Sequence, residues 1–174
     1  MLIFKTQRLM VKSCEEKDRA NFIELLTDPK IIDPSPGHKI DPEEVEQKFK
    51  TNLKLEKIPR KGIDNIWGVY ELGNNEMIGM AAILTNDANE WELGYRFLVK
   101  CWGKGYGTEL AKGLIDYSLL SLNFNKITAD VDVSNKASVK ILEKYMNLEK
   151  EFYNSEDKCM DRRYELRKEN WIKE

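Results

Sequence analysis

The strongest constraint on the fold is a series of three strand-type segments joined by short turns, followed by alternating helix-type and strand-type segments. Residues 66–72, 77–84 and 91–99 are rich in β-branched and aromatic residues, with turn residues between them. After them, apolar residues about one turn apart predict a helix from residue 106 onward, residues 127–133 alternate strictly, and residues 135–146 present one apolar helical side. A meander followed by crossover units predicts an α/β fold with a mixed sheet.

The flanking segments extend this pattern at both ends. Leu9 and Val11 alternate with polar neighbours and predict a first strand, and residues 13–16 have the spacing of a capping box before a helix. Residues 27–39 contain prolines and a glycine and are expected to form a loop, after which Asp41 begins a second helix. Closing strands are expected at residues 148–153 and 162–167. The order is therefore β-α-α-β-β-β-α-β-α-β-β, and residues 1–174 are expected to form a single domain.

Composition excludes several classes of function. The chain has 28 Lys and Arg against 30 Asp and Glu, for a net charge of −2, so no nonspecific nucleic-acid partner is expected. The longest apolar run, residues 77–84, is far shorter than the roughly 20 residues of a membrane-spanning helix, and charges interrupt the N-terminal apolar stretch. Three widely spaced cysteines without a C-x-x-C pair predict neither a disulfide framework nor a metal site. These features together predict a cytoplasmic protein without a membrane partner.

The segment with the most chemical information is W-G-K-G-Y-G-T over residues 102–108, between a predicted strand and a predicted helix. Three alternate glycines allow positive φ angles and a close approach of the backbone to a ligand. Successive N–H groups can then point into one concavity at the positive end of the helix dipole, where phosphates bind. A tight strand-to-helix turn without a ligand is the alternative. The spacing matches neither a Rossmann fingerprint nor a P-loop.

A second group of polar residues follows the strand at residues 127–133. Asn135 and Ser138 open the next helix, and an Asn side chain at a strand's end can bond backbone or ligand amides. Simple helix capping by Ser134 or Asn135 is the favoured explanation for either residue when it is taken alone.

The order of these motifs resembles the GCN5-related N-acetyltransferase (GNAT) superfamily. The resemblance rests on the strand, the G-K-G-Y-G-T loop, the helix and strand after it, and the N-x-x-S that opens a helix reading SVKILEKY. The opening FKTQRLMVKSCEEKDRANFIELLTDPKI is similar to the branch that includes the ribosomal-protein N-terminal acetyltransferases. The resemblance implies a twisted, mostly antiparallel sheet, flanked by about four helices and splayed between its fourth strand (residues 91–99) and its fifth (residues 127–133).

The resemblance also implies that acetyl-CoA lies in this split as co-substrate. The loop would contact the diphosphate mainly through backbone N–H groups, the end of the fourth strand would pair with the pantetheine arm, and the Asn would lie on the far side of the arm. The residues that this assigns to coenzyme binding are Arg96, Phe97, Leu98, Gly103, Lys104, Gly105, Tyr106, Gly107, Thr108, Asn135 and Ser138.

The chain departs from the family pattern in three places. Trp102 stands where Gln or Arg is common, and Asn147 stands near the usual glycine, whose left-handed conformation it is expected to adopt. Leu142 stands where many members carry a Tyr that is thought to protonate the leaving thiolate. This last departure leaves the general acid unassigned.

Glu92 is the first candidate for the base that deprotonates the amine. It lies on the strand beside the split, and an ion pair with Arg96 or simple solvation is the alternative. Asp130 and Asp132 share one face of the next strand and are expected to face solvent, with a role as bases or as anchors of the substrate amine as the alternatives. His38 is expected to be ordinary surface, and Cys101 lacks the base partner that a covalent mechanism needs. The strand aromatics either line an acceptor pocket or, as is more common for strand aromatics, belong to the core, and none is assigned individually; they are Trp67, Tyr70, Trp91, Tyr95 and Phe97.

The resulting hypothesis is an N-acetyltransferase that moves acetyl from acetyl-CoA directly to a primary amine, either a protein N-terminus or a small molecule. Acceptor specificity is expected to depend on residues 27–61 and on the C-terminal hairpin, and a homodimer is common in the family. Two alternatives stay open. One is a catalytically silent CoA-binding or sensor module, and the other is a nucleotide-binding protein that uses the same glycine loop.

Overall fold

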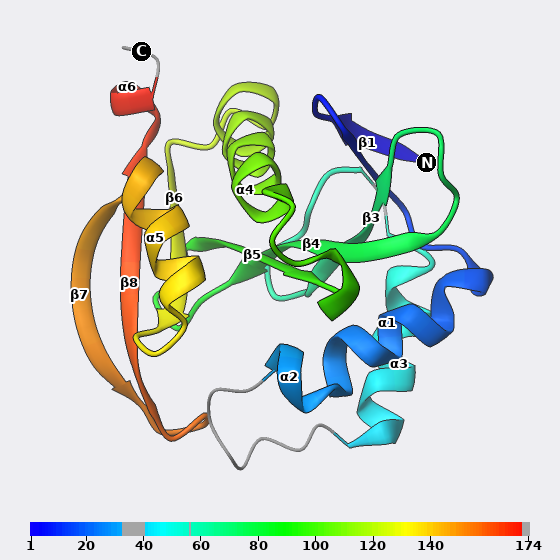
Figure 1. The fold of residues 1–174 in the computed structure, drawn as a ribbon. Coiled ribbons are helices and arrows are strands. Elements are labelled where there is room, and N and C mark those ends of the chain that lie inside the picture. Colours follow the sequence, from blue (N-terminus) through cyan, green and yellow to red (C-terminus); the bar gives the residue numbers. More distant parts are fainter. Residues whose placement is uncertain (33–40, 56, 172–174) are drawn as a thin grey trace.

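The computed structural model describes residues 1–32, 41–55 and 57–171 of the chain (Figure 1). Its backbone is organised around one eight-stranded sheet with the order β1-β2-β3-β4-β5-β6-β8-β7, in which β5 and β6 are the parallel neighbours and the other pairs are antiparallel. The strands are β1 (Leu2–Lys5), β2 (Leu9–Lys12), β3 (Asn65–Glu71), β4 (Met77–Thr85), β5 (Trp91–Phe97), β6 (Lys126–Asp132), β7 (Asn147–Asn154) and β8 (Cys159–Arg167).

Helices cover both faces of this sheet (Figure 1). The α-helices of the described residues are α1 (Arg19–Thr27), α2 (Pro29–Ile32), α3 (Pro42–Asn52), α4 (Tyr106–Asp116), α5 (Lys136–Tyr145) and α6 (Lys168–Trp171). Short 3-10 turns precede α1 (Glu16–Asp18) and α4 (Val99–Cys101), and a π-helical turn (Tyr117–Ser121) extends α4. The mixed, mostly antiparallel sheet with flanking helices confirms the predicted fold class.

Two apolar clusters hold the layers together, one on each face. Residues of α1 and α3 such as Phe22 and Phe49 pack with Met80 of β4 on one face. Residues of α4 and α5 such as Leu114 and Leu142 pack with Ile83 and other strand residues on the opposite face. The alternation of side chains along β4 and β5 supplies both clusters, because successive residues point to opposite faces.

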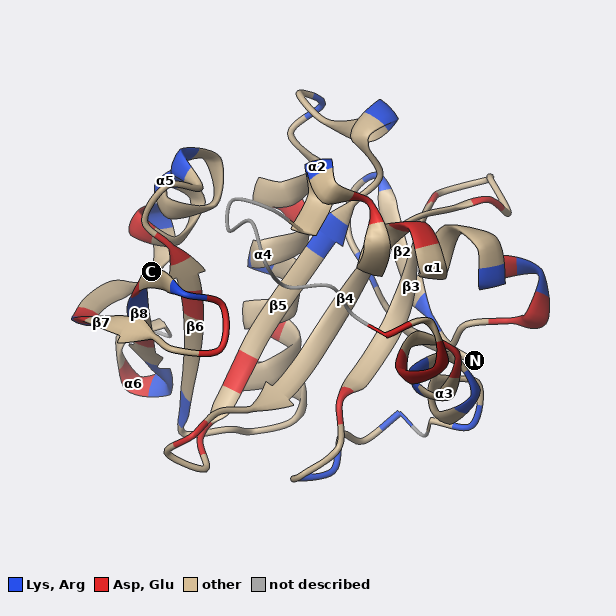
Figure 2. Cartoon of the chain, turned by 90° about the horizontal axis from the view of Figure 1, so that it is seen from below, with Lys and Arg blue, Asp and Glu red and all other residues tan. Residues whose placement is uncertain are grey.

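The sheet parts between β5 and β6. Their register consists of one pair, Glu92 with Thr128. The Thr128 hydroxyl donates to the Trp91 carbonyl at 3.1 Å and accepts from Asn86 at 3.2 Å, so it ties this end together. Figure 2 shows the two strands close at this end and diverging toward the other. The predicted split between the strands at 91–99 and 127–133 is confirmed.

Several local predictions were wrong at the N-terminal half of the chain. The expected loop at residues 27–39 instead begins with the end of α1 and then α2, because Pro29 occupies the first position of a helix and the Asp28 carboxylate accepts from Lys30 N at 2.9 Å. The predicted capping box lies two residues later, where Asp18 accepts from Glu15 N at 2.8 Å. The edge strand β1 was not predicted.

Fewer predictions were wrong in the C-terminal half of the chain. The strand expected to run to residue 99 ends at Phe97, where a 3-10 turn takes over. Asn147 opens β7 and is not among the left-handed non-glycine residues of the described chain, which are Asn89, Asn123 and Lys158. The short helix α6 was also missed.

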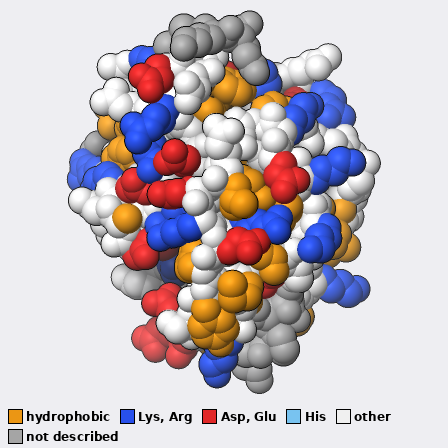
Figure 3. Space-filling view, turned by 90° about the vertical axis from the view of Figure 1, so that its left-hand side faces the viewer, with side chains coloured by type: hydrophobic (Ala, Val, Ile, Leu, Met, Phe, Trp, Pro, Cys, Tyr) orange, Lys and Arg blue, Asp and Glu red, His pale blue; other side chains and the backbone are white. Residues whose placement is uncertain are grey.

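β7 is the edge strand at the C-terminal side of the sheet. Together with β8 it exposes three large apolar side chains, Leu148, Tyr153 and Met160. Figure 3 views the molecule from this side, where charged side chains of both signs and apolar side chains are intermixed. Within the part of the chain that the structure describes, no helix has the length and apolar character needed to cross a membrane.

Candidate active site

The glycine loop leads directly into α4. Gly103 and Gly105 have φ angles of 75° and 78°, and Gly105 is the N-cap residue of the helix. Both positions use the left-handed conformation that the sequence analysis expected of this loop. No side chain of the described residues caps α4. The first N–H groups of the helix, which lack intrahelical partners, are therefore left without a side-chain acceptor.

Gly107 serves a different purpose from the other two glycines. It lies in the first turn of α4, and a Cβ added there would lie 3.1 Å from Cδ1 of Ile141 and 3.7 Å from Cε2 of Tyr95. The absence of a side chain thus lets α4 approach α5 and β5 closely. This contact places the first turn of α4, which follows the loop, against Ile141 in the middle of α5.

An N-terminal arginine that sequence reasoning missed braces the loop from outside. Arg8 Nε donates to Glu109 Oε2 at 2.7 Å, and Arg8 Nη1 donates to the Lys104 carbonyl at 3.0 Å. Arg8 N and the Thr6 hydroxyl both donate to Glu109 Oε1, at 2.7 and 2.6 Å. The turn between β1 and β2 is thereby tied to the first turn of α4. Arg8 and Glu109 are 101 residues apart, so no local pattern could reveal the pair.

The end of β5 directs alternate main-chain groups toward the split. Leu98 N donates to the Ile78 carbonyl at 3.0 Å, on the β4 side. In an antiparallel ladder the main-chain groups of the intervening residues, Tyr95 and Phe97, point the other way, toward β6. Of the predicted segment 96–98, Phe97 is therefore the residue whose main chain faces the split. The Trp102 indole donates to the Phe97 carbonyl at 2.9 Å and fixes this strand end.

Asn135 and Ser138 lie at the start of α5. Asn135 is the N-cap residue, and its Oδ1 accepts from Ser138 N at 3.1 Å. The capping role that was the alternative for Asn135 is therefore present. It uses only the carbonyl oxygen of the side chain and gives Asn135 a fixed orientation.

Glu92 lies on the opposite face of the sheet from the loop. It pairs with Leu84 across β4, and Leu84 packs against the α1–α3 cluster. Burial, and secondarily the Asp130 carboxylate, raises the pKa of Glu92 to about 8. The Glu92–Arg96 ion pair considered above does not form. The Arg96 guanidinium instead donates to the Leu25 carbonyl of α1 at 3.5 Å, and burial lowers the pKa of Arg96. In Figure 2, β5 carries one red (acidic) segment and one blue (basic) segment, and the two are separated along the strand.

Asp130 does not face solvent, so that prediction was wrong. Both of its carboxylate oxygens accept from Arg163, at 2.8 and 2.7 Å, and Arg163 also donates to Asp87 at 2.7 Å. The Arg163 side chain is 3% exposed. Because Asp130 and Arg163 are directly opposite on β6 and β8, the ladder places their side chains on one face. Sequence alternation identified the face but not the buried arginine that occupies it.

The other candidates carry less weight. Cys101 is 5% exposed, and burial raises its pKa, which disfavours a thiolate nucleophile. His38 lies outside the described residues. Asp132, Cys159 and Asp161 have ligand atoms within 4.8 Å of one another, but Cys159 Sγ donates to Asp161 at 3.3 Å and Asn154 donates to Asp161 at 2.8 Å. Hydrogen bonding accounts for this cluster.

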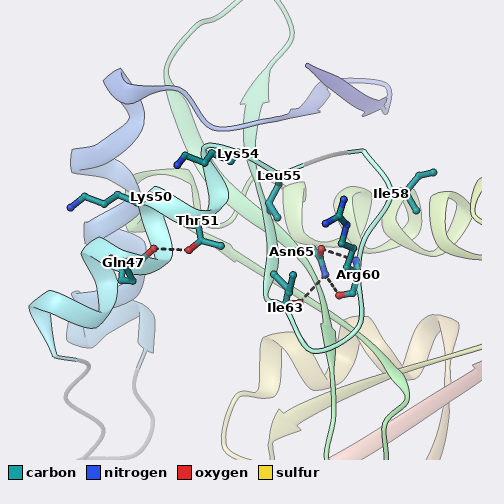
Figure 4. Close-up of a pocket in the computed structure, with 9 residues that line it drawn as sticks. All are labelled: Gln47, Lys50, Thr51, Lys54, Leu55, Ile58, Arg60, Ile63 and Asn65. Atoms are coloured by element: carbon teal, nitrogen blue, oxygen red, sulfur yellow. Dashed lines mark hydrogen bonds between the residues drawn. The ribbon is translucent and has the colours of Figure 1, made fainter.

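A recess of about 400 Å³ between α3 and the approach to β3 is separate from the split (Figure 4). Its described lining consists of Gln47, Lys50, Thr51, Lys54, Leu55, Ile58, Arg60, Ile63 and Asn65. Asn65 hydrogen-bonds the main chain of Arg60 and stabilises the loop, whereas Thr51 donates to the Gln47 carbonyl within α3. This described lining has no carboxylate, thiol or imidazole, and we therefore locate the candidate active site at the split.

The chain is similar in sequence to a family of acetyltransferases. The family model described as "Acetyltransferase (GNAT) domain" matches residues 8–145. The protein YkkB of Bacillus subtilis is 29% identical over 143 residues, which are 80% of this chain and 81% of YkkB. The N-acetyltransferase p20 of Bacillus licheniformis is 28% identical over 140 residues, 79% of this chain and 77% of that protein.

Solved structures share the fold at lower identity. A GNAT-family acetyltransferase from Bacillus anthracis superimposes with a TM-score of 0.76 at 23% identity, over 97% of this chain and 99% of that one. RimL, a ribosomal L7/L12 α-N-protein acetyltransferase in complex with coenzyme A, superimposes with a TM-score of 0.73 at 17% identity, over 96% and 98% of the two chains.

Proposed function

Since its residues 8–145 match the family model, the chain belongs to the GNAT acetyltransferase family, and from this premise we propose that it acetylates a primary amine with acetyl-CoA. The acceptor is a protein N-terminus or a small-molecule amine. The observation that carries the proposal is the loop at 103–108, which has two left-handed glycines and no side-chain cap at α4, beside a sheet that parts after a single β5–β6 pair.

The residues of this region fit a diphosphate on physical grounds. The N-terminus of α4 offers N–H donors and the positive end of the helix dipole, both of which favour an anion. A Cβ added at Gly103 would meet no atom within 4 Å, so the main chain there is open to close approach. We assign coenzyme contact to Gly103, Lys104, Gly105, Tyr106, Gly107 and Thr108, with Phe97 beside the pantetheine arm and Asn135 and Ser138 across from it.

In the proposed reaction the amine attacks the thioester directly in a ternary complex. A bound acetyl-CoA supplies the activated acetyl group. The Phe97 N–H, which faces the split, is the candidate donor to the developing oxyanion. Glu92 is the candidate base, because its ionised form, which becomes populated as the pH rises toward its pKa of about 8, can accept a proton from the ammonium group of the acceptor.

The test of this function is acetyl transfer to a panel of amines. We expect the purified chain to release free CoA thiol from acetyl-CoA in the presence of a peptide with a free N-terminus, a polyamine or an amino acid. The accepted amine should gain the mass of one acetyl group, and a peptide with a blocked N-terminus and no lysine is the control. If no acceptor of any class supports transfer, the proposal fails.

A CoA-binding module without turnover is the second candidate, and Leu142 is the observation that favours it. Leu142 is 6% exposed and stands where many family members carry a Tyr. Thermal stabilisation by CoA together with inactivity on every amine would select this candidate. Stabilisation by ATP or NAD in place of CoA would instead select a nucleotide-binding protein.

Two broader expectations stay predictions, namely that residues 1–174 form one domain and that the protein resides in the cytoplasm. The oligomeric state is a third open question, and the homodimer common in the family is the case to test. Light scattering of the purified chain measures the last, and limited proteolysis measures the first.

A further inference from the structure

A guanidinium on β5 lacks a counter-charge among the described residues. Arg96 is partly buried, and its one hydrogen bond there runs to the Leu25 carbonyl of α1 at 3.5 Å, near the limit for such a bond. The buried Arg163 of β8, by contrast, is neutralised by Asp130 and Asp87. Charges removed from water are normally paired, and the Arg96 guanidinium keeps further N–H donors, so it can bind an anion from outside the chain.

One carboxylate acts on Arg96 through space without pairing with it. Burial lowers the pKa of Arg96, and Asp157, in the turn between β7 and β8, opposes this shift. Asp157 forms no ion pair with Arg96 among the described residues and accepts from Asn154 at 3.1 Å. The guanidinium therefore stays charged without a direct carboxylate partner.

Arg96 lies at one end of an uncovered strip of β5. Because side chains alternate along the strand, Glu92, Gly94 and Arg96 share the face that carries α1 and α3. All three are partly exposed, whereas the neighbouring strand β4 is buried over most of its length. A Cβ added at Gly94 would meet within 4 Å only side chains of β4, Ala82 at 3.8 Å and Leu84 at 3.9 Å. No described residue of another layer therefore covers the middle of this strip.

The strip lies beside the position proposed for the thioester. Arg96 directly precedes Phe97, whose N–H is the candidate oxyanion donor, and Glu92, the candidate base, lies about 13 Å from Arg96 along the strand. The glycine loop and α4 lie on the opposite face of the sheet. An acceptor on the strip would thus approach the split from one face and the coenzyme from the other.

We propose, on the basis of the acetyl transfer proposed above, that Arg96 binds a carboxylate of the acceptor. The acceptor is then an amine that also carries an acidic group, either a free amino acid or a peptide that begins with Asp or Glu. The guanidinium donates two parallel N–H bonds to the carboxylate, and the amine lies over Gly94 between Arg96 and Glu92. A polyamine brings only positive charge to this guanidinium and is disfavoured.

The test compares acceptors that differ only in the acidic group. A peptide that begins with glutamate is paired with one that begins with glutamine, and a free amino acid is paired with its amide. We expect the wild-type chain to show a kcat/KM at least about tenfold higher for the acidic member of one pair, because a desolvated charge pair is lost in the other. The pair that shows this preference identifies the source of the carboxylate. A polyamine should be a poorer acceptor than either acidic compound.

Variants of Arg96 then test the contact. Arg96→Gln should lower kcat/KM for the acidic acceptor about 10²-fold and leave that for its neutral partner unchanged, while CoA affinity stays the same. Arg96→Lys keeps the charge but not the planar fork and should restore part of the preference. The melting temperature of Arg96→Gln should not fall, because an unpaired charge is removed. Arg162→Gln is the matched control: it removes a guanidinium that pairs with Glu151 on the other face of β8 and should leave the preference unchanged.

Gly94→Val tests the uncovered strip separately. It places a side chain where the acceptor is proposed to lie, so KM for the acceptor should rise while the dissociation constant for CoA stays the same. Equal use of both members of each pair by the wild-type chain overturns the inference and leaves the proposed function intact, as does a preference that Arg96→Gln retains. Absence of transfer to every amine overturns the proposed function and the inference with it.

Discussion

Arg163 donates hydrogen bonds to both carboxylate oxygens of Asp130, at 2.8 and 2.7 Å, across the neighbouring strands β6 and β8. The Arg163 side chain is 3% exposed and the Asp130 side chain is 17% exposed, so most of the ion pair is shielded from solvent. The second partner of Arg163, Asp87, is 72% exposed. The neutralisation of this buried guanidinium therefore depends mainly on Asp130.

Asp130→Asn should destabilise the protein strongly. It leaves a buried guanidinium without its main counter-charge, which typically costs about 3–5 kcal/mol. The free energy of unfolding, measured by urea denaturation, should fall by an amount of this order. Asp87→Asn is the matched control and should cost less than about 1 kcal/mol, because Asp87 is exposed. Equal losses in the two variants would contradict the assignment.

Glu92 should make stability depend on pH. Its pKa is about 8 in the folded chain against an ordinary 4.5, so between these values the folded state holds a proton that the unfolded state releases. Its contribution is fully present below the unfolded pKa and is lost as pH rises through about 8, with a slope of up to roughly 1.4 kcal/mol per pH unit. Glu92→Gln should remove this decline in unfolding free energies measured between about pH 5 and pH 9.

The control for this pH effect is Glu90→Gln. Lys126 lowers the pKa of Glu90, so its contribution is lost at acidic pH and is constant above the ordinary pKa. The two variants should therefore differ in the direction of their pH dependence. If the unfolding free energy of Glu92→Gln declines with pH as steeply as that of the wild type, the inference that Glu92 is buried and protonated is wrong.

Gly105→Glu should abolish stabilisation by CoA. It introduces bulk and negative charge where the diphosphate is proposed to lie, and a ligand at 100 times its dissociation constant otherwise stabilises by about 2.7 kcal/mol. Thermal unfolding with and without CoA measures the difference. Gly73→Glu matches the backbone strain, since the φ angles of Gly105 and Gly73 are 78° and 84°. That variant should lose stability yet keep its response to CoA, and the same response in Gly105→Glu would refute the loop assignment.

Arg8→Gln should weaken CoA binding without contacting the ligand. The side chain holds both Glu109 and the Lys104 carbonyl, so its loss should loosen the loop and raise the dissociation constant about three- to tenfold, or about 0.6–1.4 kcal/mol. Calorimetric titration with CoA measures this. Arg19→Gln breaks a similar exposed pair with Glu46, between α1 and α3, and should leave CoA affinity unchanged. A matching loss of affinity in Arg19→Gln would argue against a specific role for Arg8.

The parts of the site that were predictable are local in sequence. The left-handed glycines at 103 and 105 and the cap formed by Asn135 with Ser138 arise from residues within a few positions of one another. The strand and helix order was readable for the same reason. The errors fell where signals were weak or ambiguous: β1 is a short edge strand of four residues, and α2 was hidden by prolines that also suit a loop.

The chemistry of the site was less predictable, because it depends on contacts between distant segments. The sequence did not assign the strand aromatics individually, and only the packing of α4 against β5 shows that the Tyr95 hydroxyl is buried. The raised pKa of Glu92 depends on burial and on Asp130 of another strand.

Neighbouring residues along the chain thus determined most of the secondary structure, the family pattern and the position of the glycine loop, since backbone preferences and periodicity act over a few residues. The assembled fold settled which side chains are charged, paired or left without a partner at the split. Arg163 with Asp130 and Arg8 with Glu109 could meet only after the sheet and helices had packed, because burial and electrostatic contact depend on distance in space rather than on separation in sequence.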